Sequence, residues 1–233
     1  MADLTTYALD GATAVITMDD GKANALSTEM IDQLTAALDR AEREAKAILL
    51  AGRPERFCAG FDLKVMMSGP ANAVALLTKG GELLMRLYAA KLPLVIACTG
   101  HALAGGALVV LTGDVRIAAA GAFKIGLNEV SIGLPVPVLA MELARDRLIK
   151  PELDRATLMA TIYTPDEGHR AGYVDAVVPA SELLATAMKE AARLGALPSQ
   201  AFRATKQRLR GATIATIRTG MKSDLETLMS PQP

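Results

Sequence analysis

Short apolar runs of strand length alternate with longer stretches of helical period in the first half of this chain, and this alternation constrains the fold most. The runs with strand character are 12–18, 47–50, 94–98 and 115–118. A helix capped by Ser27 separates the first two, and helical stretches 72–90 and 106–112 follow. Strands joined by helices pair in parallel, with both faces of the sheet covered. The sequence therefore predicts an α/β fold.

The pattern changes after residue 179, where apolar residues recur at helical spacing alone. We expect one helix from Leu183, a second that starts at Pro198 and a last one that starts at Gly211. A chain of 233 residues suffices for one large unit, or for one unit with a small appendage. We therefore expect a core over residues 1–179 and a helical region over residues 180–233.

Charge and cysteine content exclude several classes of protein. The 25 basic side chains balance 25 acidic ones, whereas a nucleic-acid-binding domain is normally strongly basic. Cys58 and Cys98 lie far apart without CxxC or Cys/His spacing, so we expect two reduced thiols and no metal site. His101 and His169 have no Ser or Cys partner at a recognisable spacing, and so indicate no catalytic triad.

One uncharged run, 92–113, is long enough to span a membrane at about 20 residues per crossing. Thr99, Gly100 and Gly105 interrupt it, so we expect a strand, a loop and a helix there and no membrane association. The N-terminal residues lack the basic and apolar regions of a secretion signal. We therefore expect a cytoplasmic protein whose mature chain starts here.

Three segments could carry chemistry. Segment 56–63 (RFCAGFDL) is a turn of small residues after an apolar strand. In segment 100–107 (GHALAGGA), glycines between a strand and a helix can aim amide N–H groups at a negatively charged oxygen, although close packing of helix on strand would also require glycine. In segment 125–139, Glu129 is the sole ionisable side chain. It is either an exposed acid in a turn or a desolvated carboxylate whose raised pKa suits a general base.

These segments, in this order and spacing, resemble the crotonase (enoyl-CoA hydratase/isomerase) superfamily. The motifs that carry the resemblance are RFCAGFDL, GHALAGGALVVLTGDVRIAA and FKIGLNEVSIGLP, and it extends through TPDEGHRAGYVDAVVP into the helical tail. The resemblance implies an α/β spiral core of ββα turns and a helical C-terminal region that mediates trimer formation, sometimes with trimers pairing into hexamers. It also implies acyl-CoA thioesters as substrates, with no cofactor besides the coenzyme A of the substrate.

The resemblance further implies an oxyanion hole made by the backbone N–H groups of Phe61 and Gly105. Such a hole favours the enolate oxygen over the neutral thioester carbonyl. The residues implied to bind the substrate or its coenzyme A are Lys22, Ala23, Ala59, Gly60, Asp62, Leu63 and Leu108. Phosphates of coenzyme A need cationic donors, and Lys22, Lys64 and Lys206 are the candidates.

Family members that hydrate a double bond use two glutamates. Here Leu108 stands where the first would be, and Glu129 matches the second. A single carboxylate suits an isomerase that moves one proton between two carbons, and the motifs are similar to those of the mitochondrial type of 3,2-enoyl-CoA isomerase. Two alternatives remain open: a hydratase whose second acid is Asp62 or Glu142, and a non-catalytic scaffold that binds acyl-CoA or RNA.

Overall fold

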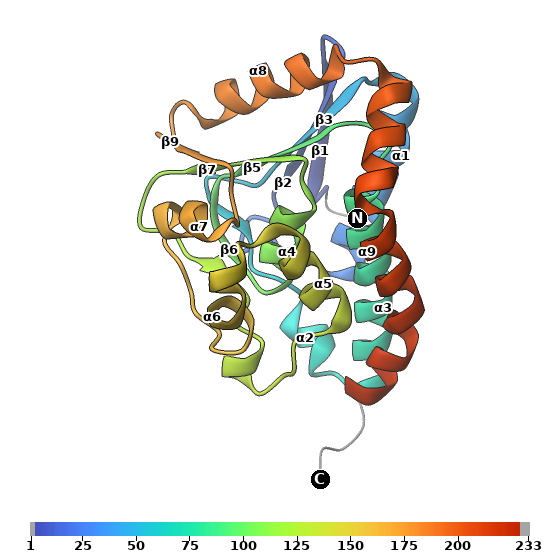
Figure 1. The fold of residues 1–233 in the computed structure, drawn as a ribbon, viewed down its shortest axis with the longest axis vertical. Coiled ribbons are helices and arrows are strands. Elements are labelled where there is room, and N and C mark those ends of the chain that lie inside the picture. The colour runs from blue at the N-terminus through green and yellow to red at the C-terminus, as the bar shows by residue number, and fades with distance from the viewer. Residues whose placement is uncertain (1–2, 229–233) are drawn as a thin grey trace.

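A computed structural model describes residues 3–228 of the chain, and within them the strands form two sheets (Figure 1). The strands of the larger sheet, in spatial order, are β1 (Thr5–Asp10), β2 (Thr13–Met18), β3 (Ala47–Ala51), β5 (Leu94–Cys98), β7 (Val115–Ala119) and β9 (Ala176–Val178). The smaller sheet holds β4 (Glu55–Cys58), β6 (Gly100–Leu103) and β8 (Ile125–Gly126). Apart from the antiparallel pair β1–β2, all neighbours run parallel.

From β3 onward, successive strands alternate between the two sheets, which produces a spiral. β3, β5 and β7 enter the large sheet, and each is followed by a shorter strand, β4, β6 or β8, that enters the small one. The helices that come after these pairs include α2 (Leu63–Met66), α3 (Pro70–Tyr88), α4 (Gly105–Thr112) and α5 (Val138–Arg147). The predicted spiral of ββα turns is confirmed.

The predicted strands and most predicted helices form because their apolar periodicity matches a buried face. Helix α1 (Thr28–Glu44) begins after Ser27, whose side chain accepts the N–H of Met30, as the sequence indicates. The prediction of a separate helix from Gly211 is wrong. A single helix α9 (Ser199–Leu228) runs through that residue, because one glycine costs a helix only about 1 kcal/mol.

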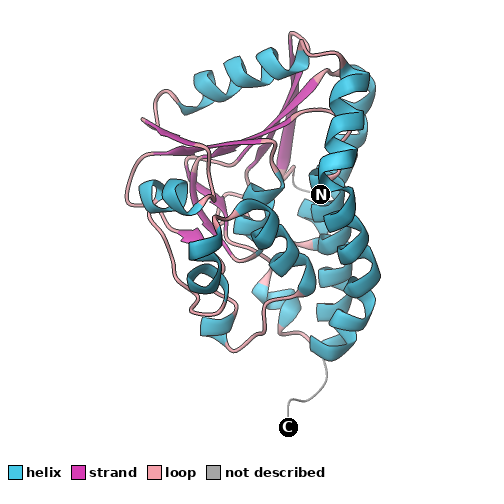
Figure 2. Cartoon of the chain, in the orientation of Figure 1, coloured by secondary structure: helices cyan, strands magenta, loops and turns pink. Residues whose placement is uncertain are grey.

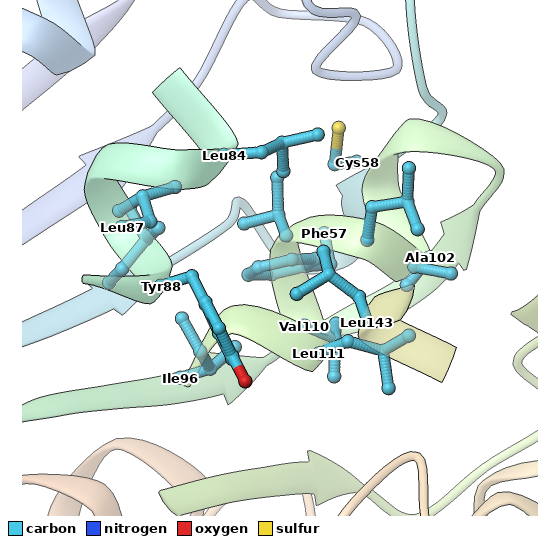
Figure 3. Packing of buried hydrophobic residues seen from close by; sticks show 14 of the residues in the cluster. Phe57, Cys58, Leu84, Leu87, Tyr88, Ile96, Ala102, Val110, Leu111 and Leu143 are labelled. Carbon is cyan, nitrogen blue, oxygen red and sulfur yellow. The ribbon is translucent and has the colours of Figure 1, made fainter. Parts of the chain in front are cut away.

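Helices cover both faces of the large sheet, as Figure 2 shows. Helix α8 (Leu183–Gly195) packs on β3, β5 and β7 through the side chains Leu183, Ala187, Ala191 and Leu194. On the other face lies the main core, in which side chains of α3, α4 and α5 meet around Phe57 (Figure 3). Helix α7 (Pro165–Ala171) contacts β8 and β9, and helix α6 (Leu153–Thr157) contacts α5.

The helical tail is joined to the core by buried charge. In α9, Lys206 and Arg210 both pair with Asp114, at 2.8 and 2.9 Å, and all three side chains are largely buried. Arg210 also donates to the carbonyl oxygens of Thr112 and Gly113 at the C-terminal end of α4. The domain boundary at 179/180 and the trimer-forming role of the tail stay predictions.

Two further observations concern the described part of the chain. None of its helices combines the length and the apolar character that a membrane crossing requires. Residues 3–228 also contain no group of three or more His, Cys, Asp or Glu side chains placed to hold a metal ion.

Candidate active site

The three segments singled out in the sequence meet at one edge of the small sheet. Because β4, β6 and β8 are parallel neighbours, the residues that follow each strand leave the sheet at the same edge. These are Ala59–Phe61 after β4, Ala104 and Gly105 after β6, and Leu127–Glu129 after β8. The N–H of Ala104 donates to the carbonyl of Gly126 at 3.0 Å, which ties the second segment to the third.

The backbone N–H groups of Phe61 and Gly105 are both free to bind a ligand oxygen. Leu26 donates its N–H to Gly60 and accepts the N–H of Asp62, which holds both sides of Phe61 and leaves the N–H between them free. In residues 3–228, neither Phe61 nor Gly105 donates its N–H to a protein acceptor. The two segments are in contact, since a Cβ built on Gly60 would lie 3.2 Å from the nitrogen of Gly105.

Backbone strain at Ala104 aims the start of α4 into the site. Ala104 has φ 48° and ψ −121°, in a region that non-glycine residues rarely occupy. The glycine that follows Gly105 is required for a different reason. A Cβ on Gly106 would overlap the carbonyl of Cys58, 2.7 Å from its carbon. The loop glycines therefore permit close packing of α4 on β4, while the strained turn falls on an alanine.

Glu129 lies at the same edge, and its carboxylate is buried there. Its side chain is 8% exposed, and its Oε2 has no hydrogen-bond partner among the described residues. Burial raises the pKa of Glu129 above the ordinary glutamate value. Its main chain is held by the turn that it starts, since its carbonyl accepts the N–H groups of Ile132 and Leu134. A fixed, desolvated carboxylate of this kind suits a general base.

Two other buried polar atoms close to Glu129 also lack partners in the part of the chain that the structure describes: Asn128 Oδ1 and the Tyr173 hydroxyl. Tyr173 is fully buried and lies close enough to Glu129 for the two side chains to interact electrostatically. Sequence reasoning missed Tyr173, because a tyrosine after a helix reads as an ordinary core residue.

A small apolar cavity of about 40 Å³ adjoins the site. Phe61 and Leu108 form part of its wall. Gly81 of α3 and two residues of α9, Met221 and Asp224, also line the cavity. Sequence reasoning did not find these three. The signal that could have pointed to them was the pair of glycines inside an otherwise regular helix, at 80 and 81.

The residues expected to bind coenzyme A fall into two groups. In the first group, Ala59 donates its N–H to the carbonyl of Ala23 at 3.0 Å. Lys22, Leu63 and Lys64, which are close to these two residues in the sequence, are exposed. Lys206 is different: it is 7% exposed and paired with Asp114, beyond the end of α4 opposite Gly105. The interpretation of Lys206 as a phosphate ligand is therefore wrong, because its charge is already used inside the protein.

The alternative acids for a hydratase are engaged elsewhere. Asp62 caps α2 by accepting the N–H of Lys64 at 2.8 Å. Glu142 forms an ion pair with Arg145 on the same helix. Neither lines the apolar cavity beside Phe61 and Leu108.

Comparison with known proteins agrees with this geometry. The model of the enoyl-CoA hydratase/isomerase family matches residues 9–232. The chain belongs to this family. Mitochondrial enoyl-CoA delta isomerase 1 of Homo sapiens is 33% identical over 222 residues, which cover 93% of this chain and 74% of the human protein.

Two solved structures show that the enoyl-CoA hydratase/isomerase fold extends over the whole described chain. An enoyl-CoA hydratase/isomerase family protein from Pseudomonas syringae is 38% identical, with a TM-score of 0.94, over 97% of this chain and 98% of that one. An enoyl-CoA hydratase from Mycobacterium ulcerans is also 38% identical, with a TM-score of 0.94, over 98% and 100%. The protein is therefore an enzyme of the enoyl-CoA isomerase and hydratase type, and its relatives include both.

Proposed function

We propose that the protein is an isomerase that converts a 3-enoyl-CoA into the 2-enoyl-CoA, with Glu129 as its one acid–base group. The observation that carries the proposal is the buried carboxylate of Glu129, whose Oε2 has no partner among the described residues. It lies at the sheet edge where the N–H groups of Phe61 and Gly105 have no acceptor within residues 3–228. The residue that faces the cavity from α4 is Leu108, which can neither move a proton nor hold a water molecule.

The chemistry follows from these groups. The thioester oxygen of the substrate accepts both N–H groups, and Glu129 removes a proton from C2. The electrons of that C–H bond form an enolate conjugated with the C3–C4 double bond, and its negative charge rests on the oxygen held by Phe61 and Gly105. Glu129 then returns the same proton to C4, which leaves the double bond between C2 and C3. No water is consumed and no electron acceptor is needed, so coenzyme A enters only as part of the substrate.

The oxyanion hole and the base make contributions of comparable size. One oxyanion-hole donor is typically worth about 3 kcal/mol of barrier, and a positioned general base about 10²- to 10⁴-fold in rate. Desolvation of Glu129 matters because a carboxylate with a raised pKa is a stronger base toward a carbon acid.

We further propose that Lys22 and Lys64, which are exposed and close in sequence to Ala23 and Ala59, bind phosphates of coenzyme A. We also propose that the protein forms a homotrimer or a pair of trimers.

The test is Glu129→Gln, which keeps the shape of the side chain and removes its basicity. We expect turnover of a 3-enoyl-CoA to fall at least about 10²-fold, while binding of a saturated acyl-CoA stays within a few-fold of the original protein. The matched control is Glu142→Gln, the same chemical change at a carboxylate paired with Arg145, and it should leave turnover unchanged.

Hydration of a 2-enoyl-CoA is measured in parallel. Hydration faster than isomerisation, or hydration lost in Glu142→Gln, would favour the hydratase alternative. Full isomerase turnover in Glu129→Gln would refute the assignment of the base. Tight RNA binding at physiological salt without turnover would favour a scaffold.

A further inference from the structure

On the α9 side, the apolar cavity beside the oxyanion hole is lined by Met221, with Asp224 one turn further on. Phe61 and Leu108 form the part of its wall next to the reacting groups. Met221 fits against a helix position that has no side chain: a Cβ on Gly81 of α3 would lie 3.0 Å from its Sδ and 3.7 Å from a methyl group of Leu139. The thioether therefore occupies space that α3 leaves free.

Two contacts hold this part of α9 in place. The carboxylate of Asp224, one turn after Met221, accepts the N–H of Val138 at 2.7 Å. That N–H belongs to the first turn of α5, where Pro137 provides no side-chain cap, so Asp224 satisfies a donor that the helix itself cannot. On the other side of Met221, a Cβ on Gly220 would lie 3.2 Å from Val138. Residues on either side of Met221 in the chain are thus held against Val138.

The size of the cavity limits what can enter it. The cavity is small, about 40 Å³, so it has room for only a few carbon groups beyond the reacting ones. A 3-enoyl group places its first four carbons at the oxyanion hole and the base. Its total length would therefore be limited to about six carbons.

We propose that Met221 sets the upper limit on acyl-chain length, and that the substrates are short-chain enoyl-CoA thioesters of about four to six carbons. This inference rests on the proposed acyl-CoA site. It adds a specificity-determining residue from the helical tail, a region in which sequence reasoning found no site residue apart from Lys206.

The experiment measures binding, so that it does not depend on which reaction the enzyme catalyses. Dissociation constants are determined by calorimetry for saturated acyl-CoA thioesters from butanoyl to dodecanoyl. In the original protein we expect affinity to rise about fourfold per added methylene up to hexanoyl, and then to stop rising. Met221→Ala removes three heavy atoms from the wall, so its affinity should continue to rise to octanoyl or decanoyl, with a gain of about tenfold for octanoyl-CoA.

Two other variants complete the series. Met221→Phe fills the cavity and should move the limit down toward butanoyl, which gives a change of opposite sign in case the alanine variant folds poorly. Leu209→Ala truncates an exposed side chain of the same helix, 72% accessible, and should leave the profile unchanged.

The outcomes separate this inference from the proposed reaction. A profile that rises steadily to dodecanoyl in the original protein, or an unchanged limit in both Met221 variants, overturns the inference even if isomerase turnover is present. The expected limit without isomerase turnover refutes the proposed reaction and leaves the role of Met221 standing. Failure to bind any acyl-CoA overturns both.

Discussion

Replacing Gly80 by alanine should disable the oxyanion hole from a distance. The ring of Phe61 lies where the new methyl group would go: a Cβ on Gly80 would be 2.6 Å from its Cζ and closer still to its Cε1. An ordinary carbon contact needs about 3.5 Å, so the nearest ring atom must move by about 1.5 Å. On its opposite edge the ring faces Gly105, 3.2 Å from the position that a Cβ would take there.

The displaced ring belongs to one proposed donor residue and presses on the other. A shift of about 1 Å in a positioned group can cost about 10²-fold in rate, and loss of one oxyanion donor costs about 10² to 10³ in kcat. We therefore expect Gly80→Ala to lower kcat for a 3-enoyl-CoA by about 10²-fold or more, with a smaller change in KM. The assay is steady-state isomerisation, followed by absorbance of the conjugated product.

Two comparisons isolate the cause. Gly211→Ala places the same methyl group inside α9, where no atom lies within 4 Å, so it should stabilise the protein by about 0.5 to 1 kcal/mol and leave kcat unchanged. In the background of Phe61→Ala, which removes the ring and keeps the backbone N–H, Gly80→Ala should have little further effect. If kcat of Gly80→Ala stays within threefold of the kcat of the original protein, the Phe61 ring between α3 and α4 does not position the oxyanion hole.

Three further predictions concern buried ionisable groups. Because burial raises the pKa of Glu129, kcat should rise with pH through an apparent pKa above 4.5. Burial of the ionised carboxylate should also lower the stability of the protein as pH rises. Glu129→Gln should therefore unfold at a higher temperature than the original protein at pH 7, but not at pH 4. An acid limb at the ordinary glutamate pKa would contradict this. Asp114→Ala leaves two buried cations of α9 unpaired and should lower the free energy of unfolding in urea by about 3 to 5 kcal/mol; a loss below 1 kcal/mol would show that the tail is held by other contacts. Burial raises the pKa of Cys58 and Cys98 to about 12, so neither thiol should react with iodoacetamide at pH 8 until urea unfolds the chain, and rapid labelling of the folded protein would refute their burial.

Several strands were beyond sequence reasoning for a physical reason. β4, β6 and β8 have two to four residues each, too few to show a period, and each pairs with a strand more than 20 residues away in the chain. The sequence predicts turns there, since small residues and glycines dominate. The helix through Gly211 was missed for the converse reason: a local glycine signal was outweighed by apolar contacts of α9 with α3 and α5.

Within the site, the residue types were readable and their surroundings were not. Glu129 stands out in the sequence as the one ionisable group in an apolar segment, and the loop glycines as a place where backbone N–H groups can be exposed. That Glu129 is buried and unpartnered depends on the packing of residues from several elements, including Tyr173. The same holds for Lys206, whose sequence neighbours give no sign of the distant Asp114 that neutralises it.

The amino-acid sequence alone thus determined the class of fold, the family resemblance and the candidate base, because periodicity and short motifs are local properties of the chain. The tertiary structure decided three things: that the two N–H groups and the carboxylate share one sheet edge, that the ring of Phe61 lies between two helices, and that Met221 lines the cavity. Each depends on contacts between segments far apart in the chain. Such contacts are specified by the packing of the whole molecule and leave no pattern in any one stretch of sequence.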